Sequence, residues 1–231
     1  MKSLFNSYDM NVERAYIIRV KDNEKSEQLA MRCAQSCIQI GMSYDFWDAY
    51  NGMGEEIVEP EHSRENNFMR MLKITDHYLT RGEAACALSH ISLWCKCVEQ
   101  DKPIVILEHD SIMTQPYTAH GVYNSICYLG GREQALQGWQ VYPTPPHASE
   151  GPNYRFICRA HAYAIDPAVA KNMLAYVLKQ GIHAPLDIML RADIFPIHQM
   201  GVFAYDLDDQ TTILNRPKEG RTTQRNDRLE Y

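Results

Sequence analysis

The 231-residue sequence lacks the features of several special protein classes. Its most apolar short stretch, 104–107, is far shorter than the ~20 residues of a membrane span. Residues 1–10 have no apolar core of the kind that a signal peptide needs. The seven cysteines form an odd set without a C-x-x-C pair, which argues against a disulfide framework or a zinc ribbon. We therefore expect a soluble, cytoplasmic protein with reduced, mostly buried cysteines.

An excess of basic residues is also absent. Lys and Arg number 23 against 29 Asp and Glu, for a net charge of −6, whereas a dedicated duplex-DNA binder usually shows a basic face. The hydrophobic fraction of 45% and the charged fraction of 23% are ordinary globular values, so wholesale disorder and a coiled coil are excluded. The length suits one domain. We expect that domain over 1–214 and a polar, flexible tail over 215–231.

The start of the chain reads as strand, helix and strand. Residues 16–20 are apolar and β-rich, and Ser26 is the predicted N-cap of a helix that runs to Ile40. An aromatic, strand-like segment follows over 44–50. This β-α-β order predicts parallel pairing with a right-handed crossover, and hence an α/β fold.

The remainder of the chain continues the alternation. Thr80 and Glu83 form the pattern of a capping box, which predicts that a helix begins at residue 81, before the buried strand 103–107. The other predicted elements are short helices near 68–74 and after Pro185, strands over 155–165 and 195–205, a helix over 167–178, and mostly loop over 114–154.

Two acidic residues follow the strand 103–107 directly. Ligands of open α/β sheets bind beyond the carboxyl ends of the strands, which is where Glu108 and Asp110 stand. Residues at i and i+2 of an extended chain lie on the same side. Two carboxylates so close resist ionisation unless a cation lies between them, and Mg²⁺ or Mn²⁺ accepts such oxygen ligands. A solvated turn with two unrelated acids is the alternative.

The residues around these acids resemble a known family. Residues 79–110, LTRGEAACALSHISLWCKCVEQDKPIVILEHD, are similar to the signature of glycosyltransferase family 25, the lipopolysaccharide and collagen galactosyltransferase family. That signature has a Gly-Glu pair, a Cys-Ala-Leu-Ser-His helix segment, an apolar strand and an acidic E-D-D triplet. The matching residues here are 82–83, 86–90, 104–107 and 108–110, and weaker similarities at 48–52, 161–165, 185–187 and 196–199 extend the resemblance over about 14–215.

The resemblance implies a GT-A-like, Rossmann-type fold with a mixed, mostly parallel sheet flanked by helices. It also implies an inverting, metal-dependent enzyme that moves a hexose, galactose or glucose, from a UDP-sugar to a hydroxyl of a glycan-type acceptor. Glu108 and Asp110 would hold the metal, with Mn²⁺ favoured over Mg²⁺. Inversion needs a base on another element, for which we select Asp187, with Glu150 as a weaker candidate. The alternative for Asp187 is a first-turn acid that complements the helix dipole.

Two departures from the family pattern concern the donor site. Arg19 and Val20 stand where the family has Asn-Leu. His109 replaces the middle acid of the triplet. It either binds Mn²⁺ as neutral imidazole or is simply packed or solvated. The expected donor-binding residues are Arg19, Val20, Asn51, Ser89, His90, His109 and Gln199. A packing role is the alternative for Ser89 and His90, and a structural role for His161 and His198, which otherwise could complete a metal shell. Trp139 could stack on an acceptor sugar, whereas Trp47 and Trp94 are expected in the core.

Two rival functions remain open. One is a transferase that glycosylates a hydroxylated DNA base, guided by the basic residues of 216–228. The other is a non-catalytic nucleotide-sugar-binding module. Arg19 and His109 favour it, because both depart from the family pattern. A dinucleotide-binding dehydrogenase is disfavoured because no G-x-G-x-x-G follows the first strand.

Overall fold

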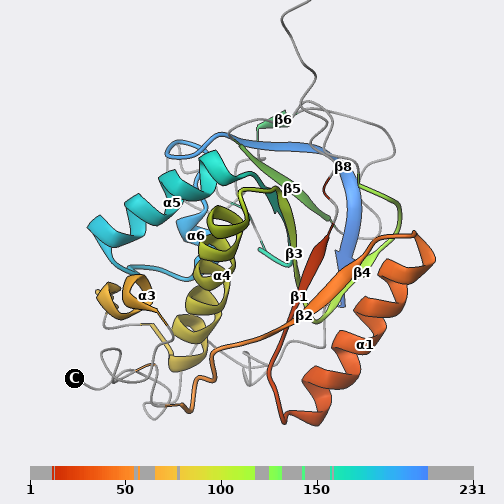
Figure 1. Cartoon of the computed structure of the whole chain (residues 1–231), viewed down its shortest axis with the longest axis horizontal. Coiled ribbons are helices and arrows are strands. Elements are labelled where there is room, and N and C mark those ends of the chain that lie inside the picture. Colours follow the sequence, from red (N-terminus) through yellow and green to blue (C-terminus); the bar gives the residue numbers. More distant parts are fainter. Residues whose placement is uncertain are drawn as a thin grey trace, which may run out of the picture.

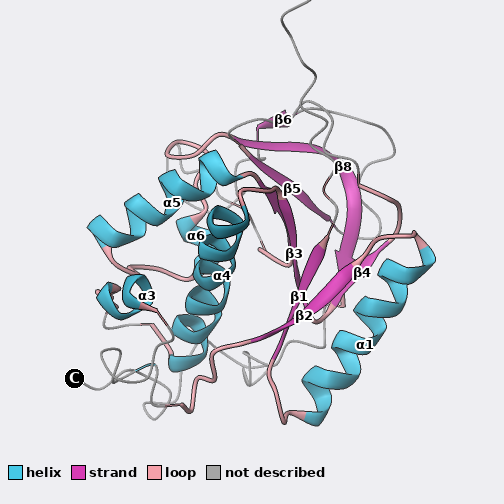
Figure 2. Cartoon of the chain, in the orientation of Figure 1, coloured by secondary structure: helices cyan, strands magenta, loops and turns pink. Residues whose placement is uncertain are grey.

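The computed structural model describes residues 12, 14–54, 57, 66–76, 79–117, 125–131, 142–143, 157 and 159–207. Helices and strands are interspersed along the chain (Figures 1 and 2). The elements are β1 (Ala15–Arg19), α1 (Glu24–Gln39), β2 (Tyr44–Asp48), α3 (Asn67–Met71), α4 (Arg81–Gln100), β3 (Ile104–Glu108), β4 (Ser111–Met113), β5 (Ile126–Gly131), β6 (Tyr142–Pro143), β7 (Ala162–Ile165), α5 (Pro167–Gln180), α6 (Leu186–Met189) and β8 (Ile197–Asp206). The predicted tail 215–231, Glu150 and Trp139 lie outside the described residues.

A single mixed sheet forms the centre of the molecule. Its strand order is β2-β1-β3-β7-β5-β8-β4, and β6 pairs with β8. β1 runs parallel to both β2 and β3, as the β-α-β start of the sequence predicts. β7 is antiparallel to β3 and β5, and β8 is parallel to β5 but antiparallel to β4. The α/β fold class with a mixed sheet is therefore confirmed.

Helices cover both faces of the sheet. Figure 1 shows α1 on one side and α3, α4, α5 and α6 on the other. Successive side chains of a strand point to opposite faces, so Val105 and Leu107 pack toward α1 while Ile106 packs toward α4. β3 is thus buried on both faces, which explains its unbroken apolar run.

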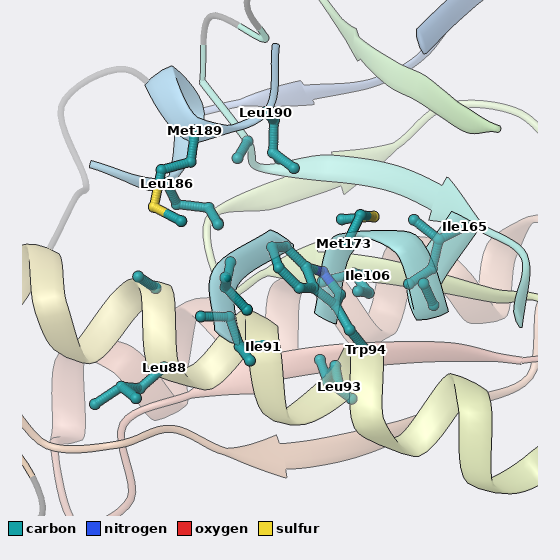
Figure 3. Close-up of a cluster of buried hydrophobic side chains, with 14 of the residues drawn as sticks. Leu88, Ile91, Leu93, Trp94, Ile106, Ile165, Met173, Leu186, Met189 and Leu190 are labelled. Carbon is teal, nitrogen blue, oxygen red and sulfur yellow. The ribbon is translucent and has the colours of Figure 1, made fainter. Parts of the chain in front are cut away.

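The larger core lies under α4. Trp94 is buried there with Ile106 of β3 and Met173 of α5, and α6 closes the cluster with Leu186 and further apolar side chains (Figure 3). Because α6 is anchored in this core, the acidic residue in its first turn has a fixed position relative to α4. Among the helices that the structure describes, none is long and apolar enough to cross a membrane.

The predicted capping box fixes the start of α4. Thr80 Oγ1 accepts a hydrogen bond from Glu83 N at 3.2 Å, and Glu83 Oε2 accepts one from Thr80 N at 2.9 Å. Such caps are worth about 1 kcal/mol. The helix therefore begins where the sequence predicts, and its first three turns carry Cys86, Ser89 and His90.

Two sequence predictions were wrong. The N-cap of α1 is Asn23, whose Oδ1 accepts from Ser26 N at 3.0 Å, and Ser26 itself is fully buried. The segment 114–154, predicted as mostly loop, contains two strands that the prediction left out, β5 and β6. Gly130, predicted as a loop residue, lies in β5 opposite Ala204. Glycine is needed there because a Cβ would lie 2.4 Å from Cε1 of His161.

Candidate active site

Glu108 and Asp110 lie at the carboxyl end of β3. β1 and β3 are parallel, with Ile18 opposite Glu108, so the carboxyl ends of both strands meet at this edge. The chain turns at His109 and Asp110 and enters β4. The extended geometry that we assumed for the two acids therefore ends at Glu108, and a turn brings Asp110 near it.

Asp110 is a buried carboxyl group near two other acids, Glu108 and Asp206, whose charges outweigh that of Arg159. The residue is 7% exposed, and its Oδ1 has no hydrogen-bond partner in the described part of the chain. Asp206 is brought close because β8 pairs with β4. Burial, followed by the negative charges of Glu108 and Asp206, raises the pKa of Asp110 to about 7. A divalent cation would remove this conflict, so the carboxylate pair fits the metal that the resemblance implies.

The pKa of Glu108 is shifted in the opposite direction to that of Asp110. Its Oε1 lies 3.3 Å from Nε2 of His90 and 3.6 Å from Sγ of Cys86. Burial acts to raise the pKa of Glu108, but the hydrogen bond and charge of His90, with smaller effects from His109 and His161, lower it to about 2. Glu108 is therefore ionised under conditions in which Asp110 holds a proton.

A chain of buried hydrogen bonds orients His90. Trp94 Nε1 donates to the Tyr163 hydroxyl at 3.0 Å, and that hydroxyl lies 2.8 Å from Nδ1 of His90. Because indole N–H only donates, the Tyr163 oxygen accepts from Trp94. An ionised Glu108 carboxylate only accepts, so Nε2 of His90 carries a hydrogen toward it, and in the neutral ring Nδ1 then accepts from the Tyr163 hydroxyl. His90 is 1% exposed, so it positions Glu108 instead of facing solvent.

The hydroxyl group of Ser89 is buried, and its hydrogen bonds are to other parts of the protein. Its hydroxyl donates to Ala85 O at 2.7 Å and accepts from Tyr50 N at 2.9 Å. These bonds tie α4 to the segment that follows β2. That segment includes the exposed Asn51, whose Oδ1 accepts from Met53 N.

Arg19 ends β1 at the same edge of the sheet, and Val20 follows it. Arg19 Nε donates to Asp48 Oδ1 at 3.2 Å, and its guanidinium lies 4.6 Å above the ring of Phe46. Val20 N donates to Ser26 Oγ at 2.8 Å. Ser26 Oγ also lies 3.2 Å from Nδ1 of His109, which links the end of β1 to the acidic turn.

His109 is buried, and its Nε2 has no hydrogen-bond partner among the described residues. Burial lowers the pKa of His109, with the negative charge of Glu108 acting in the opposite direction. A neutral imidazole retains a nitrogen lone pair for a ligand. Of the other histidines, His198 lies in β8 opposite Cys127, and the backbone oxygen of His161 accepts from Glu108 N at 2.8 Å.

Asp187 lies in the first turn of α6, on an element separate from Glu108. Burial above all, and then the charges of Glu108 and Glu83, raise the pKa of Asp187 against the effect of the amide of Ile188. The charges of Glu108 and Asp187 also contribute to the raised pKa of the Cys86 thiol, after burial. Asp187 thus shares the electrostatic surroundings of the acidic turn. Gln199 belongs to β8, but its side chain lies outside the described residues.

Sequence reasoning did not select three residues that surround the acids. Cys86 contacts Glu108, Tyr163 contacts His90, and Asp206 affects Asp110. Of these three, only Cys86 could have been selected from the sequence. It stands four residues before His90 on a predicted helix, and residues at i and i+4 of a helix share one face.

The sequence model of glycosyltransferase family 25 (LPS biosynthesis protein) matches residues 12–124. This stretch contains β1, α1, α4 and β3 together with the acidic turn, so the match includes the residues that build the edge described above. Residues 12–124 belong to glycosyltransferase family 25. The protein is accordingly a glycosyltransferase. No curated protein matches the chain. Asp187 and Asp206 lie beyond the family 25 stretch, so their roles rest on geometry and charge.

Proposed function

We propose that this glycosyltransferase moves a hexose, galactose or glucose, from a UDP-sugar to a hydroxyl of a glycan-type acceptor, with inversion and with a divalent metal. The observation that carries the proposal is the buried Asp110, whose Oδ1 has no hydrogen-bond partner among the described residues, beside the ionised Glu108. Two acids so placed at the carboxyl edge of an α/β sheet are suited to a cation and an anionic ligand.

Glu108 and Asp110 would hold the metal. When bound, the metal neutralises the charge that develops on the departing diphosphate. The buried chain from Trp94 through Tyr163 and His90 keeps the Glu108 carboxylate in one orientation. Mn²⁺ is favoured over Mg²⁺ because the unpartnered Nε2 of His109 is close by, and Mn²⁺ accepts nitrogen more readily.

Asp187 would act as the base. Inversion requires that the acceptor hydroxyl attack the face of the sugar opposite the leaving group, and its proton must pass to a group on that side. Asp187 comes from α6 and not from the acidic turn. Its raised pKa makes the carboxylate a better proton acceptor.

The donor would lie across the carboxyl ends of β1, β2 and β3. In this proposal Arg19, Val20 and Asn51 contact the nucleoside, because they end or follow β1 and β2. Ser89 and His90 are buried below the donor and act indirectly: the internal hydrogen bonds of Ser89 hold α4 in place, and His90 orients Glu108. His109 and Gln199 complete the expected donor-binding set.

The test is a panel of nucleotide sugars with Mn²⁺ and a range of hydroxyl acceptors. We expect metal-dependent release of UDP from one UDP-hexose by the intact protein, and none by the double variant Glu108→Gln/Asp110→Asn. Glu99→Gln is a matched control, because Glu99 is exposed and pairs with Lys96 at the far end of α4. The anomeric configuration of the product, read by NMR, tests inversion.

Three outcomes would contradict the proposal. Equal release by the double variant would remove the acids from the chemistry. Metal-dependent UDP binding without turnover on any acceptor would select the non-catalytic module. Transfer to a hydroxylated polynucleotide alone, lost at modest salt, would select the DNA-modifying rival.

A further inference from the structure

Cys86, His90 and Glu108 bring three different ligand atoms together. A sulfur, a ring nitrogen and a carboxylate oxygen all lie within 4.8 Å of one another. Cys86 and His90 are one helical turn apart on α4, and Glu108 reaches them from the end of β3. The cluster therefore depends on the packing of α4 over β3, which the core beneath Trp94 holds in place.

Two of the three separations between these atoms match a tetrahedral site. With Zn–N and Zn–O near 2.0 Å and Zn–S near 2.3 Å, a tetrahedral ion separates N from O by about 3.3 Å and S from O by about 3.5 Å. The observed separations are 3.3 Å for His90 Nε2 to Glu108 Oε1 and 3.6 Å for Cys86 Sγ to the same oxygen. We propose that these residues form a binding site for Zn²⁺, with the fourth position open.

The surroundings of His90 support it as a ligand. A metal-bound histidine usually gives its other ring N–H to a fixed acceptor. The Tyr163 oxygen lies 2.8 Å from Nδ1 and has two lone pairs, enough for the N–H groups of both Trp94 and His90. On binding, the ring hydrogen moves to Nδ1, the Nε2 lone pair bonds to the metal, and the Cys86 thiol releases its proton to solvent.

This site differs from the carboxylate pair in the ions that it prefers. Thiolate and imidazole select Zn²⁺, whereas oxygen ligands select Mg²⁺ and Mn²⁺. The two sites share Glu108, so Zn²⁺ would remove that carboxylate from the metal on the diphosphate and inhibit transfer. The Zn²⁺ site stands independently of the proposed function, and only the expected inhibition rests on it.

The experiment uses the full chain and Co²⁺ as a spectroscopic probe. We expect a thiolate-to-cobalt charge-transfer band in the near ultraviolet that Zn²⁺ abolishes. Cys86→Ser should lose the band, and Cys95→Ser should keep it, because Cys95 lies on the same helix outside the cluster. Tyr163→Phe should weaken Zn²⁺ binding roughly 10–100-fold. A wild-type protein without the band, or a band that survives in Cys86→Ser, would overturn the site.

A second measurement needs no variant. Zn²⁺ should slow alkylation of Cys86 on the order of tenfold, as read by mass spectrometry, and leave Cys95 unaffected. Equal alkylation of Cys86 with and without Zn²⁺ would refute the site even if the variants failed to fold.

Activity then separates the two proposals. Zn²⁺ should inhibit UDP release by the wild type and should act more weakly on Cys86→Ser, each compared with its own rate without Zn²⁺. Zn²⁺ binding to a wild type that releases no UDP would leave the site intact and refute the proposed function. Full activity at saturating Zn²⁺ would refute the competition for Glu108.

Discussion

Replacing Asp110 by Asn should stabilise the protein in the absence of metal, and more strongly at high pH. Asn has nearly the shape of Asp but cannot ionise. Folding raises the pKa of Asp110 from its ordinary 3.8 to about 7. Between these values the unfolded chain binds fewer protons at this residue than the folded protein does, so wild-type stability falls as pH rises.

The magnitude follows from that difference in pKa. Three pKa units correspond to roughly 4 kcal/mol, an upper limit reached well above pH 7. Between about pH 5 and about pH 8, ~2–3 kcal/mol of wild-type stability should be lost through Asp110, and the Asn variant should not lose it. The stability gained by the substitution should therefore grow by that amount over this range.

Denaturant unfolding at the two pH values, with a chelator present, measures this effect. Asp45→Asn is the control, because Asp45 forms an exposed ion pair with Arg14 and such pairs contribute about 0–1 kcal/mol. Addition of Mn²⁺ and UDP should stabilise the wild type and leave Asp110→Asn unchanged. A stability difference between Asp110→Asn and wild type that does not change with pH would refute the account of Asp110 as a buried carboxyl group that binds a cation. A variant less stable than wild type at high pH would refute it as well.

Three further predictions address the base, the start of α4 and the packing of β5. Asp187→Asn should lower kcat roughly 10²–10⁴-fold with little change in donor affinity, and loss of donor affinity instead would assign it a binding role. Thr80→Ala should cost about 1 kcal/mol in denaturant unfolding, since it removes the capping box, and an unchanged midpoint would contradict the cap. Gly130→Ala should cost on the order of 1–3 kcal/mol, because the new Cβ would lie 2.4 Å from His161 Cε1, and a neutral thermal midpoint would show that the ring can move away.

The secondary structure was predictable where local chemistry decides it. The capping box of Thr80 and Glu83, the helix predicted to start at residue 167 and the β-α-β opening all appear in the structure. Asn23 was missed as an N-cap because Ser26 offers the same side-chain chemistry, and tertiary packing uses Ser26 for Val20 and His109 instead. β5 was missed because Gly130 serves close packing against His161 rather than a turn.

The candidate site was predictable in position but not in its internal contacts. An acidic pair after a buried strand indicates the sheet edge, and the structure places Glu108 and Asp110 there. The sequence places Cys86 on the same face of α4 as His90, but the contacts of Cys86 with Glu108 and of Tyr163 with His90 depend on how α4 packs against β3 and β7. The influence of Asp206 on Asp110 likewise requires the antiparallel pairing of β4 with β8, across about a hundred residues of chain.

The location of bound Mn²⁺ tests the central claim most directly. Crystals of the protein grown with Mn²⁺ and UDP, measured at the manganese absorption edge, would locate the ion by its anomalous scattering. The account predicts a peak between the carboxylates of Glu108 and Asp110, in contact with the diphosphate. A peak elsewhere, or UDP bound at this edge without any metal, would contradict it.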